Sequence, residues 1–162
     1  MSTPANIRAI RMRIGLTISE ASELFGIPIR DVEQCERSNS FIIPGGYMDE
    51  LRAVESAMLE YFYDDPIGDD PPVLIGYRNI EMLLYYEPHA APLRSNSVHR
   101  MALAQRQREI FTAMFRSVPI VELREPAYER WRLERGLPES METRIQWALE
   151  YMQRFRVNNG GY

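Results

Sequence analysis

The sequence predicts a mainly α-helical protein, with a helix-turn-helix near its N-terminus and an α-rich C-terminal part that holds one or two short strands. Three observations lead to this expectation. Capping and turn residues between Thr17 and Pro28 mark two short helices joined by a tight turn. Apolar residues recur at helical spacing through much of the remaining chain. A segment rich in Asp and Pro, residues 64–72, interrupts that pattern and predicts a boundary between two parts.

The first helix is expected over residues 6–14. Ile7, Ile10 and Ile14 fall on one face of such a helix and would face a core. Gly15 then ends it.

The next two helices are expected over about residues 18–25 and 29–37. The run from Thr17 to Glu20 has the spacing of a capping box, in which the Thr hydroxyl and the Glu carboxylate each accept a hydrogen bond from the other residue's amide. Gly26 supplies the left-handed residue that ends the second helix, and the fixed φ of Pro28 suits the start of the third. Two short helices joined by a short turn that contains glycine make a helix-turn-helix.

The rest of the chain is expected to consist of helices and two short strands. A longer helix begins at about Tyr47. Further along, we expect a strand at 73–77, helices at 80–86 and 98–115, a loop at 92–97, a strand at 120–123, a helix at 127–135 and a last helix after Ser140. The expected division is therefore a helix-turn-helix domain over 1–63, an acidic, Pro-rich linker over 64–72, and an α-rich region over 73–162 that serves dimerisation or is an extension.

Composition and charge narrow the classes of function. The net charge is −4, and the part up to Glu60 holds six arginines and nine acidic residues, which argues mildly against nucleic-acid binding. No stretch reaches the roughly 18 consecutive apolar residues of a membrane span, and the N-terminus carries no hydrophobic run typical of a signal peptide. The single cysteine excludes an internal disulfide. We therefore expect a cytoplasmic protein with no membrane partner.

Neither a catalytic site nor a metal site is expected. The chain has no nucleophile-elbow, phosphate-loop or dinucleotide motif. His89 and His99 have no ligand at metal-binding spacing, and the acidic residues of 64–70 lack the ligand order of a calcium loop. Cys35 falls on the core side of the third helix and is expected to be a buried small side chain. The sequence thus predicts no cofactor, no metal and no enzymatic activity.

A set of spaced residues in the first part of the chain carries a family resemblance. The set is Arg11, Gly15-Leu16-Thr17, Glu20, Gly26, Val32, Glu36 and Pro44. These spacings resemble those of the Cro/repressor (XRE-type) helix-turn-helix family. The finer pattern of A-I-R, L-T-I-S-E and I-I-P before a long helix is similar to the YdiL-like subgroup, which includes small regulators associated with anti-CRISPR operons. The resemblance implies a lambda-repressor-like domain and covers about two-thirds of the chain, so residues beyond about Gln107 look like an extension.

The resemblance also implies roles for individual residues. Arg11 and Glu36 would form a buried ion pair between the first and third helices. The residues expected to contact DNA are Arg8, Arg13, Thr17, Ile29, Arg30, Glu33, Gln34 and Arg37. Among them Arg30, Glu33 and Gln34 would face base edges, while the remaining arginines would meet phosphates. Two positions depart from the family pattern, namely Ile18, where the family often has Gln, and Pro28, where it favours Ser.

The function that follows is sequence-specific binding of double-stranded DNA by a regulator, in the form of a dimeric repressor. A homodimer would present two recognition helices to successive major grooves, about 34 Å apart. The apolar face of the last helix, with Trp147 and Tyr151, is either core or the homodimer interface. The alternative is a helix-turn-helix-like protein-interaction module, antitoxin-like or a scaffold, that does not bind DNA. Acidic residues that neutralise the third helix would favour this alternative.

Overall fold

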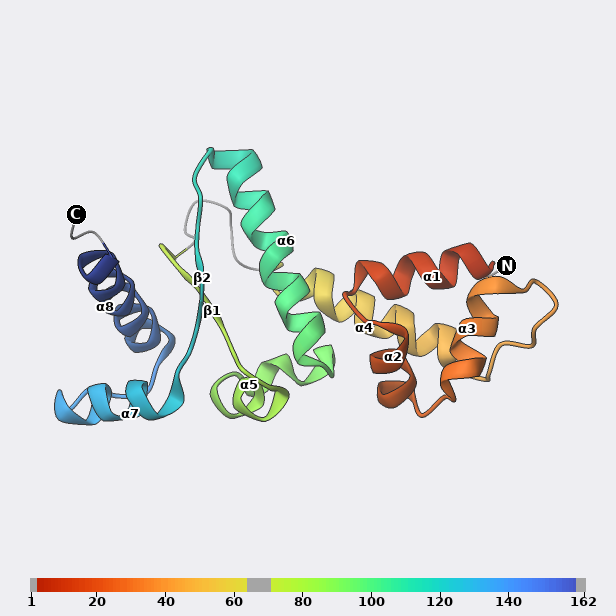
Figure 1. Cartoon of the computed structure of the whole chain (residues 1–162), viewed down its shortest axis with the longest axis horizontal. Helices are drawn as coiled ribbons and strands as arrows, with labels where there is room; N and C mark the ends of the chain where they lie inside the picture. Colours follow the sequence, from red (N-terminus) through yellow and green to blue (C-terminus); the bar gives the residue numbers. More distant parts are fainter. Residues whose placement is uncertain (1–2, 64–70, 160–162) are drawn as a thin grey trace. The chain divides into compact units, whose positions relative to one another are not determined.

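The computed structural model describes residues 3–63 and 71–159 and is mainly α-helical, with one small sheet of two parallel strands (Figure 1). This confirms the predicted fold class. Residues 64–70, most of the expected linker, lie outside the described residues. The chain divides into two compact units, Met1–Asp64 with Leu84–Ala102 and Asp65–Leu83 with Leu103–Tyr162.

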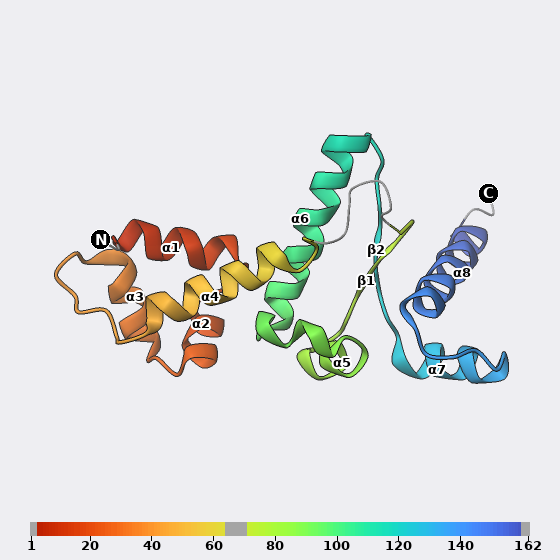
Figure 2. The same cartoon turned by 180° about the vertical axis from the view of Figure 1, so that it is seen from behind.

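The first unit is a bundle of helices (Figures 1 and 2). It contains α1 (Pro4–Arg13), α2 (Ile18–Phe25), α3 (Ile29–Arg37), α4 (Tyr47–Glu60), the 3₁₀ helix η1 (Pro88–Leu93) and the first turns of α6 (Asn96–Met114). Helix α1 packs on α3 and α4, α2 packs on α3, and η1 packs on α4. The core consists of fully buried apolar side chains, among them Ile7, Ile14, Val32, Leu51 and Val54.

The local signals in the sequence explain where these helices begin and end. Helix α1 begins two residues earlier than expected because the Thr3 hydroxyl accepts a hydrogen bond from the Asn6 amide and Pro4 fits the first helical turn. Gly15 follows it with φ +82°. Helices α2 and α3 have the predicted bounds, and Gly26 ends α2 at φ +64°.

Residues 84–102 belong to the first unit, which differs from the expected boundary after residue 63. The loop expected at 92–97 is partly helical, because η1 covers Pro88–Leu93 and α6 already begins at Asn96. The side chains of Ala90 and Leu93 are buried, and the Tyr61 hydroxyl at the end of α4 donates to the Glu87 carboxylate. These contacts hold residues 84–102 against α4. They join residues that are far apart in the sequence, so no local sequence pattern predicts them.

The second unit is built on a parallel strand pair. Strands β1 (Leu74–Gly76) and β2 (Ile120–Glu122) pair in register, with Leu74 opposite Ile120 and Gly76 opposite Glu122. Helix α7 (Glu125–Glu134) packs on α8 (Met141–Asn159), and α8 packs on β1. Helix α5 (Ile80–Tyr86) follows β1, and the division between the two units falls within it, after Leu83. Both strands lie where the sequence predicts strands, although each is shorter than expected.

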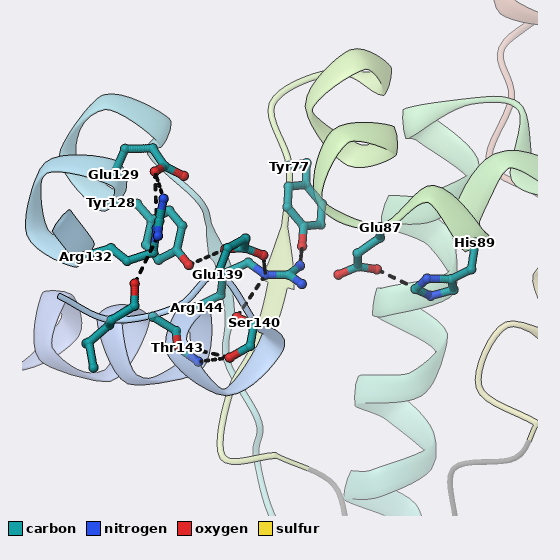
Figure 3. A network of polar contacts seen from close by, with 11 residues as sticks. Tyr77, Glu87, His89, Tyr128, Glu129, Arg132, Glu139, Ser140, Thr143 and Arg144 are labelled. Atoms are coloured by element: carbon teal, nitrogen blue, oxygen red, sulfur yellow. Dashed lines mark hydrogen bonds and ion pairs between the residues drawn. The ribbon is translucent and has the colours of Figure 1, made fainter.

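A buried polar network holds α8 in this unit (Figure 3). The Arg144 guanidinium forms an ion pair with Glu139 at 3.1 Å, and it donates to the Ser140 carbonyl at 3.3 Å and to the Tyr77 hydroxyl. Glu139 also accepts from the Tyr128 hydroxyl. Burial and this carboxylate both raise the pKa of Tyr128. Because the charge of Arg144 is shared among these partners, its burial is compensated.

Candidate nucleic-acid interface

The turn between α2 and α3 is fixed by one glycine and one side-chain bond. Gly26 takes the left-handed conformation, and the Ser22 hydroxyl donates to the Ile27 carbonyl at 2.6 Å. Ile27 itself is buried, so it anchors the turn in the core. Pro28 then precedes the first residue of α3. The two helices are therefore held as a helix-turn-helix by local contacts.

Helix α3 has a clear inner and outer side. Val32 and Cys35 are buried, at 0% and 1% exposure, which confirms the core position expected for Cys35. At about 100° per residue, Arg30 lies about 160° round the helix from Val32 and about 140° from Cys35. Arg30 is exposed, so it points away from the core in the first turn of α3.

The outer side of α3 is lined by the residues expected to contact DNA. Arg37 lies about 20° from Arg30 on the helix, and Gln34 about 40° from it, so the three form one stripe. Glu33 flanks that stripe on one side, about 60° from Arg30. Ile29, at the start of the helix, is 50% exposed.

The arginines expected to contact DNA are not equivalent. Arg8, Arg30 and Arg37 form no ion pair with the residues that the structure describes. Arg13, in contrast, pairs with Glu55 on α4 at 2.8 Å, so a carboxylate already neutralises its charge. Arg8 and Arg13 also lie about 140° apart round α1. Arg8 and Arg13 therefore do not share one surface, and of these two only Arg8 has a charge that no carboxylate among the described residues neutralises.

Arg11 and Glu36 form the ion pair that the family resemblance implied. The Arg11 Nε and Nη2 atoms lie 2.5 and 2.9 Å from the two carboxylate oxygens of Glu36, and Nη1 donates to the Leu16 carbonyl at 2.6 Å. The side chains are only 8% and 5% exposed. The hydrogen bond to Glu36 raises the pKa of Arg11. This contact joins α1 to α3 beside the start of α2.

Thr17 is exposed, but its hydroxyl and its backbone amide both form hydrogen bonds with Glu20 of α2. Its hydroxyl accepts from the Glu20 amide at 3.1 Å, and its own amide donates to the Glu20 carboxylate at 2.7 Å. The predicted capping box is therefore present. The Thr17 amide therefore already donates its hydrogen to the Glu20 carboxylate.

Sequence reasoning missed the residues after the 3₁₀ helix that touch this motif. The Ser97 hydroxyl donates to the second oxygen of Glu20, and Arg94 donates to the Leu24 carbonyl at 3.2 Å. These contacts span 77 and 70 residues. No spacing or local motif signals a contact over such a separation.

A cluster of titratable residues lies at the end of α4 in the same unit. The ring of Tyr61 stacks on His89 and meets His99 edge to face. The His89 Nε2 atom lies 3.9 Å from the Glu87 carboxylate. Figure 3 marks this contact with a dashed line. Burial lowers the pKa of His99 to about 4, although the nearby Glu87 carboxylate acts in the opposite direction. Within residues 3–63 and 71–159, no three His, Cys, Asp or Glu side chains are arranged to hold a metal ion.

In the second unit, α7 and α8 line an aromatic pocket of about 270 Å³. Its lining residues are Ala127, Trp131, Trp147, Glu150, Tyr151, Arg154 and Phe155. Trp147 is buried, so it belongs to the core of this unit, while Phe155 remains 50% exposed. Among the described helices, none is long and apolar enough to cross a bilayer.

No protein-family model matches the chain, and a search of curated proteins found no match. The functional interpretation therefore depends on the geometry described above.

Proposed function

We propose that this protein is a sequence-specific DNA-binding regulator of the Cro/repressor type that reads base edges with the outer side of α3. The observation that carries the proposal is the position of Arg30. It is exposed, lies in the first turn of α3 opposite the buried Val32, and has no ion-pair partner among the described residues. The first turns of a recognition helix are the part that contacts bases in this architecture.

Each side chain on the outer side of α3 has a chemical role in this proposal. Arg30 can donate a fork of two hydrogen bonds to guanine, and Gln34 can pair with adenine through its amide. Glu33 can accept from the amino group of cytosine. Arg37 and Arg8 would contact phosphates, which positions the helix without reading sequence. The rigid ion pair of Arg11 and Glu36 would keep α3 at a fixed angle to α1.

The proposed regulator is a homodimer that acts as a repressor in the cytoplasm. A single α3 helix of nine residues can reach only a few base pairs, so two copies are needed for a specific site. The aromatic pocket of α7 and α8, with the exposed Phe155 at its rim, is the surface that we assign to the second copy. Interfaces between copies are rich in aromatic residues, which supports this choice.

A second candidate function is supported by the acidic residues around α3. Asp31 and Glu33 are half-exposed on the same short helix as Arg30 and Arg37, and Glu55 neutralises Arg13. A helix-turn-helix unit with this balance could bind a basic protein surface instead of DNA, as an antitoxin-like module or a scaffold. This candidate predicts binding to a protein partner and none to duplex DNA.

Titration of labelled duplexes distinguishes the two functions. Fluorescence anisotropy would compare DNA from upstream of the protein's own operon with random duplex of equal length, at two salt concentrations. The regulator should prefer the upstream DNA and bind it more weakly at the higher salt, because phosphate contacts release counterions. Equal affinity for the two duplexes would contradict sequence-specific binding.

A further inference from the structure

Residues 94–101 contact the helix-turn-helix at both ends of α2, and Ser97 makes the contact at the N-terminal end. Glu20, in the first turn of α2, uses one carboxylate oxygen to accept from the Thr17 amide and the other to accept from the Ser97 hydroxyl. These hydrogen bonds outweigh the effect of burial, and the pKa of Glu20 is lower than usual as a result. The capping box of α2 is therefore extended by a residue of α6.

Arg94 contacts the other end of α2. Its Nη2 atom donates to the Leu24 carbonyl at 3.2 Å, and its guanidinium lies over the Phe25 ring at 5.2 Å. Its Nη1 atom forms an ion pair with Glu50 on α4. The backbone of Arg94 has φ +61°, a conformation that is costly for a residue with a Cβ atom and persists where surrounding contacts fix it. Here the guanidinium contacts join the C-terminal end of α2 to α4.

The same segment passes very close to the turn before α2. A Cβ atom added to Gly15 would lie 2.9 Å from the Cβ of Met101 and 3.3 Å from the Ser97 carbonyl oxygen. Only glycine fits at position 15, because any side chain would meet these atoms and because the backbone there has φ +82°. Residues 97–101 and the turn at Gly15 therefore pack with no space for a side chain.

Helix α2 needs such contacts because it has little else to hold it. It is eight residues long, shorter than a helix that is stable by itself in water, and Ala21 is its only fully buried residue. Its position thus depends on the contacts at its two ends as well as on its packing against α3. The angle at which α3 leaves the turn depends in turn on where α2 lies.

We infer that Ser97 and Arg94 are positioning residues for the DNA-binding surface, which they maintain by holding the two ends of α2. On this inference, which rests on the proposed DNA binding, the DNA-binding unit consists of residues 1–63 together with 84–102. Neither side chain contacts DNA itself. Their role is to fix α2, and through the turn at Gly26 to fix the outer side of α3.

The test uses the full chain with Arg94→Ala and Ser97→Ala, singly and together. A matched control, Arg52→Ala with Ser56→Ala, removes one guanidinium and one hydroxyl from exposed positions of α4. Two measurements are made on each protein: affinity for the specific duplex by anisotropy, and hydrogen exchange of the backbone amides in α2 and α4. The first measures positioning for DNA, and the second measures the contacts at α2 whether or not DNA binds.

The double variant should bind the specific duplex about tenfold more weakly, and its α2 amides should exchange faster while those of α4 keep their protection. Ser97→Ala alone should weaken binding by a smaller factor, and Ser97→Thr, which keeps the hydroxyl, should restore it. The control should match the wild type in both measurements. If the Arg94 variants do not fold, the comparison of Ser97→Ala with Ser97→Thr still decides the question.

Two outcomes separate this inference from the proposed function. If the wild type prefers the specific duplex and the Ser97 and Arg94 variants bind it equally well, the inference is wrong and the proposed function stands. If the wild type shows no preference for any duplex, the proposed function is wrong, and the positioning role for DNA is wrong with it.

Discussion

Arg11 and Glu36 meet through two parallel contacts of 2.5 and 2.9 Å although 25 residues separate them in the chain. The guanidinium uses its remaining terminal nitrogen to donate to the Leu16 carbonyl, so this one side chain joins α1, α3 and the turn before α2. Neither residue is exposed enough for water to replace its partner. This pair connects the fold of the first unit to the orientation of α3.

Replacement of Glu36 by Ala should destabilise the first unit by about 3–5 kcal/mol, because the charge of Arg11 would be left buried without a partner. Chemical denaturation followed by circular dichroism measures the free energy of unfolding. Arg13→Ala is the matched control, since it breaks an ion pair whose arginine is 56% exposed and should cost about 1 kcal/mol or less. Equal, small effects of the two substitutions would contradict the structural role of Glu36.

Replacement of Tyr47 by Phe should have the opposite effect and stabilise the first unit. Tyr47 is buried at the start of α4, and its hydroxyl makes no hydrogen bond with any residue the structure describes. Burial, followed by the negative charge of Glu36, raises the pKa of Tyr47 to about 12. Tyr47→Phe keeps the edge-to-face contact with Phe25 and removes the unsatisfied hydroxyl, so the free energy of unfolding should rise by about 1 kcal/mol.

Tyr61→Phe is the comparison for this prediction. The hydroxyl that it removes donates to the buried Glu87 carboxylate, and its loss should therefore lower the stability by about 1–3 kcal/mol. A loss of stability in Tyr47→Phe as large as that in Tyr61→Phe would show that the Tyr47 hydroxyl is satisfied.

His99 should make the first unit less stable in mild acid. The unfolded chain takes up a proton on this imidazole at about pH 6.5, whereas the folded protein takes it up only near pH 4, because burial opposes the charged form. Between these values the unfolded state binds more protons, so stability falls as the pH falls. The contribution is fully present above pH 6.5, and about 3 kcal/mol is lost on acidification to pH 4.

Denaturant titrations at several pH values from 7 to 4 measure this loss. His99→Gln removes the titrating group, so its free energy of unfolding should decline much less over the same range. Parallel declines in the wild type and in His99→Gln would assign the acid sensitivity to carboxylates such as Glu20, whose hydrogen-bonded form also disappears at low pH.

The elements that carry a local signal were predictable from the sequence. The Thr17–Glu20 box, Gly26 and Pro28 determine backbone hydrogen bonds and dihedral angles within a few residues, and α2 and α3 have the predicted bounds. The pairing of β1 with β2 and the return of residues 84–102 to the first unit depend on contacts between distant residues. No periodicity encodes these contacts. The ion pair between Arg13 and Glu55 was missed for the same reason.

Replacement of Arg30 by Ala tests whether the outer side of α3 reads DNA sequence. Affinities for a specific and a random duplex are measured for this variant, with Arg8→Ala and Arg37→Ala as controls. Arg30→Ala should cost about 1–3 kcal/mol on the specific duplex and much less on the random one. Each control variant should bind both duplexes more weakly by the same factor. It should also reduce the slope of log affinity against log salt concentration by about one. An unchanged ratio of specific to random affinity in Arg30→Ala would contradict base recognition by α3.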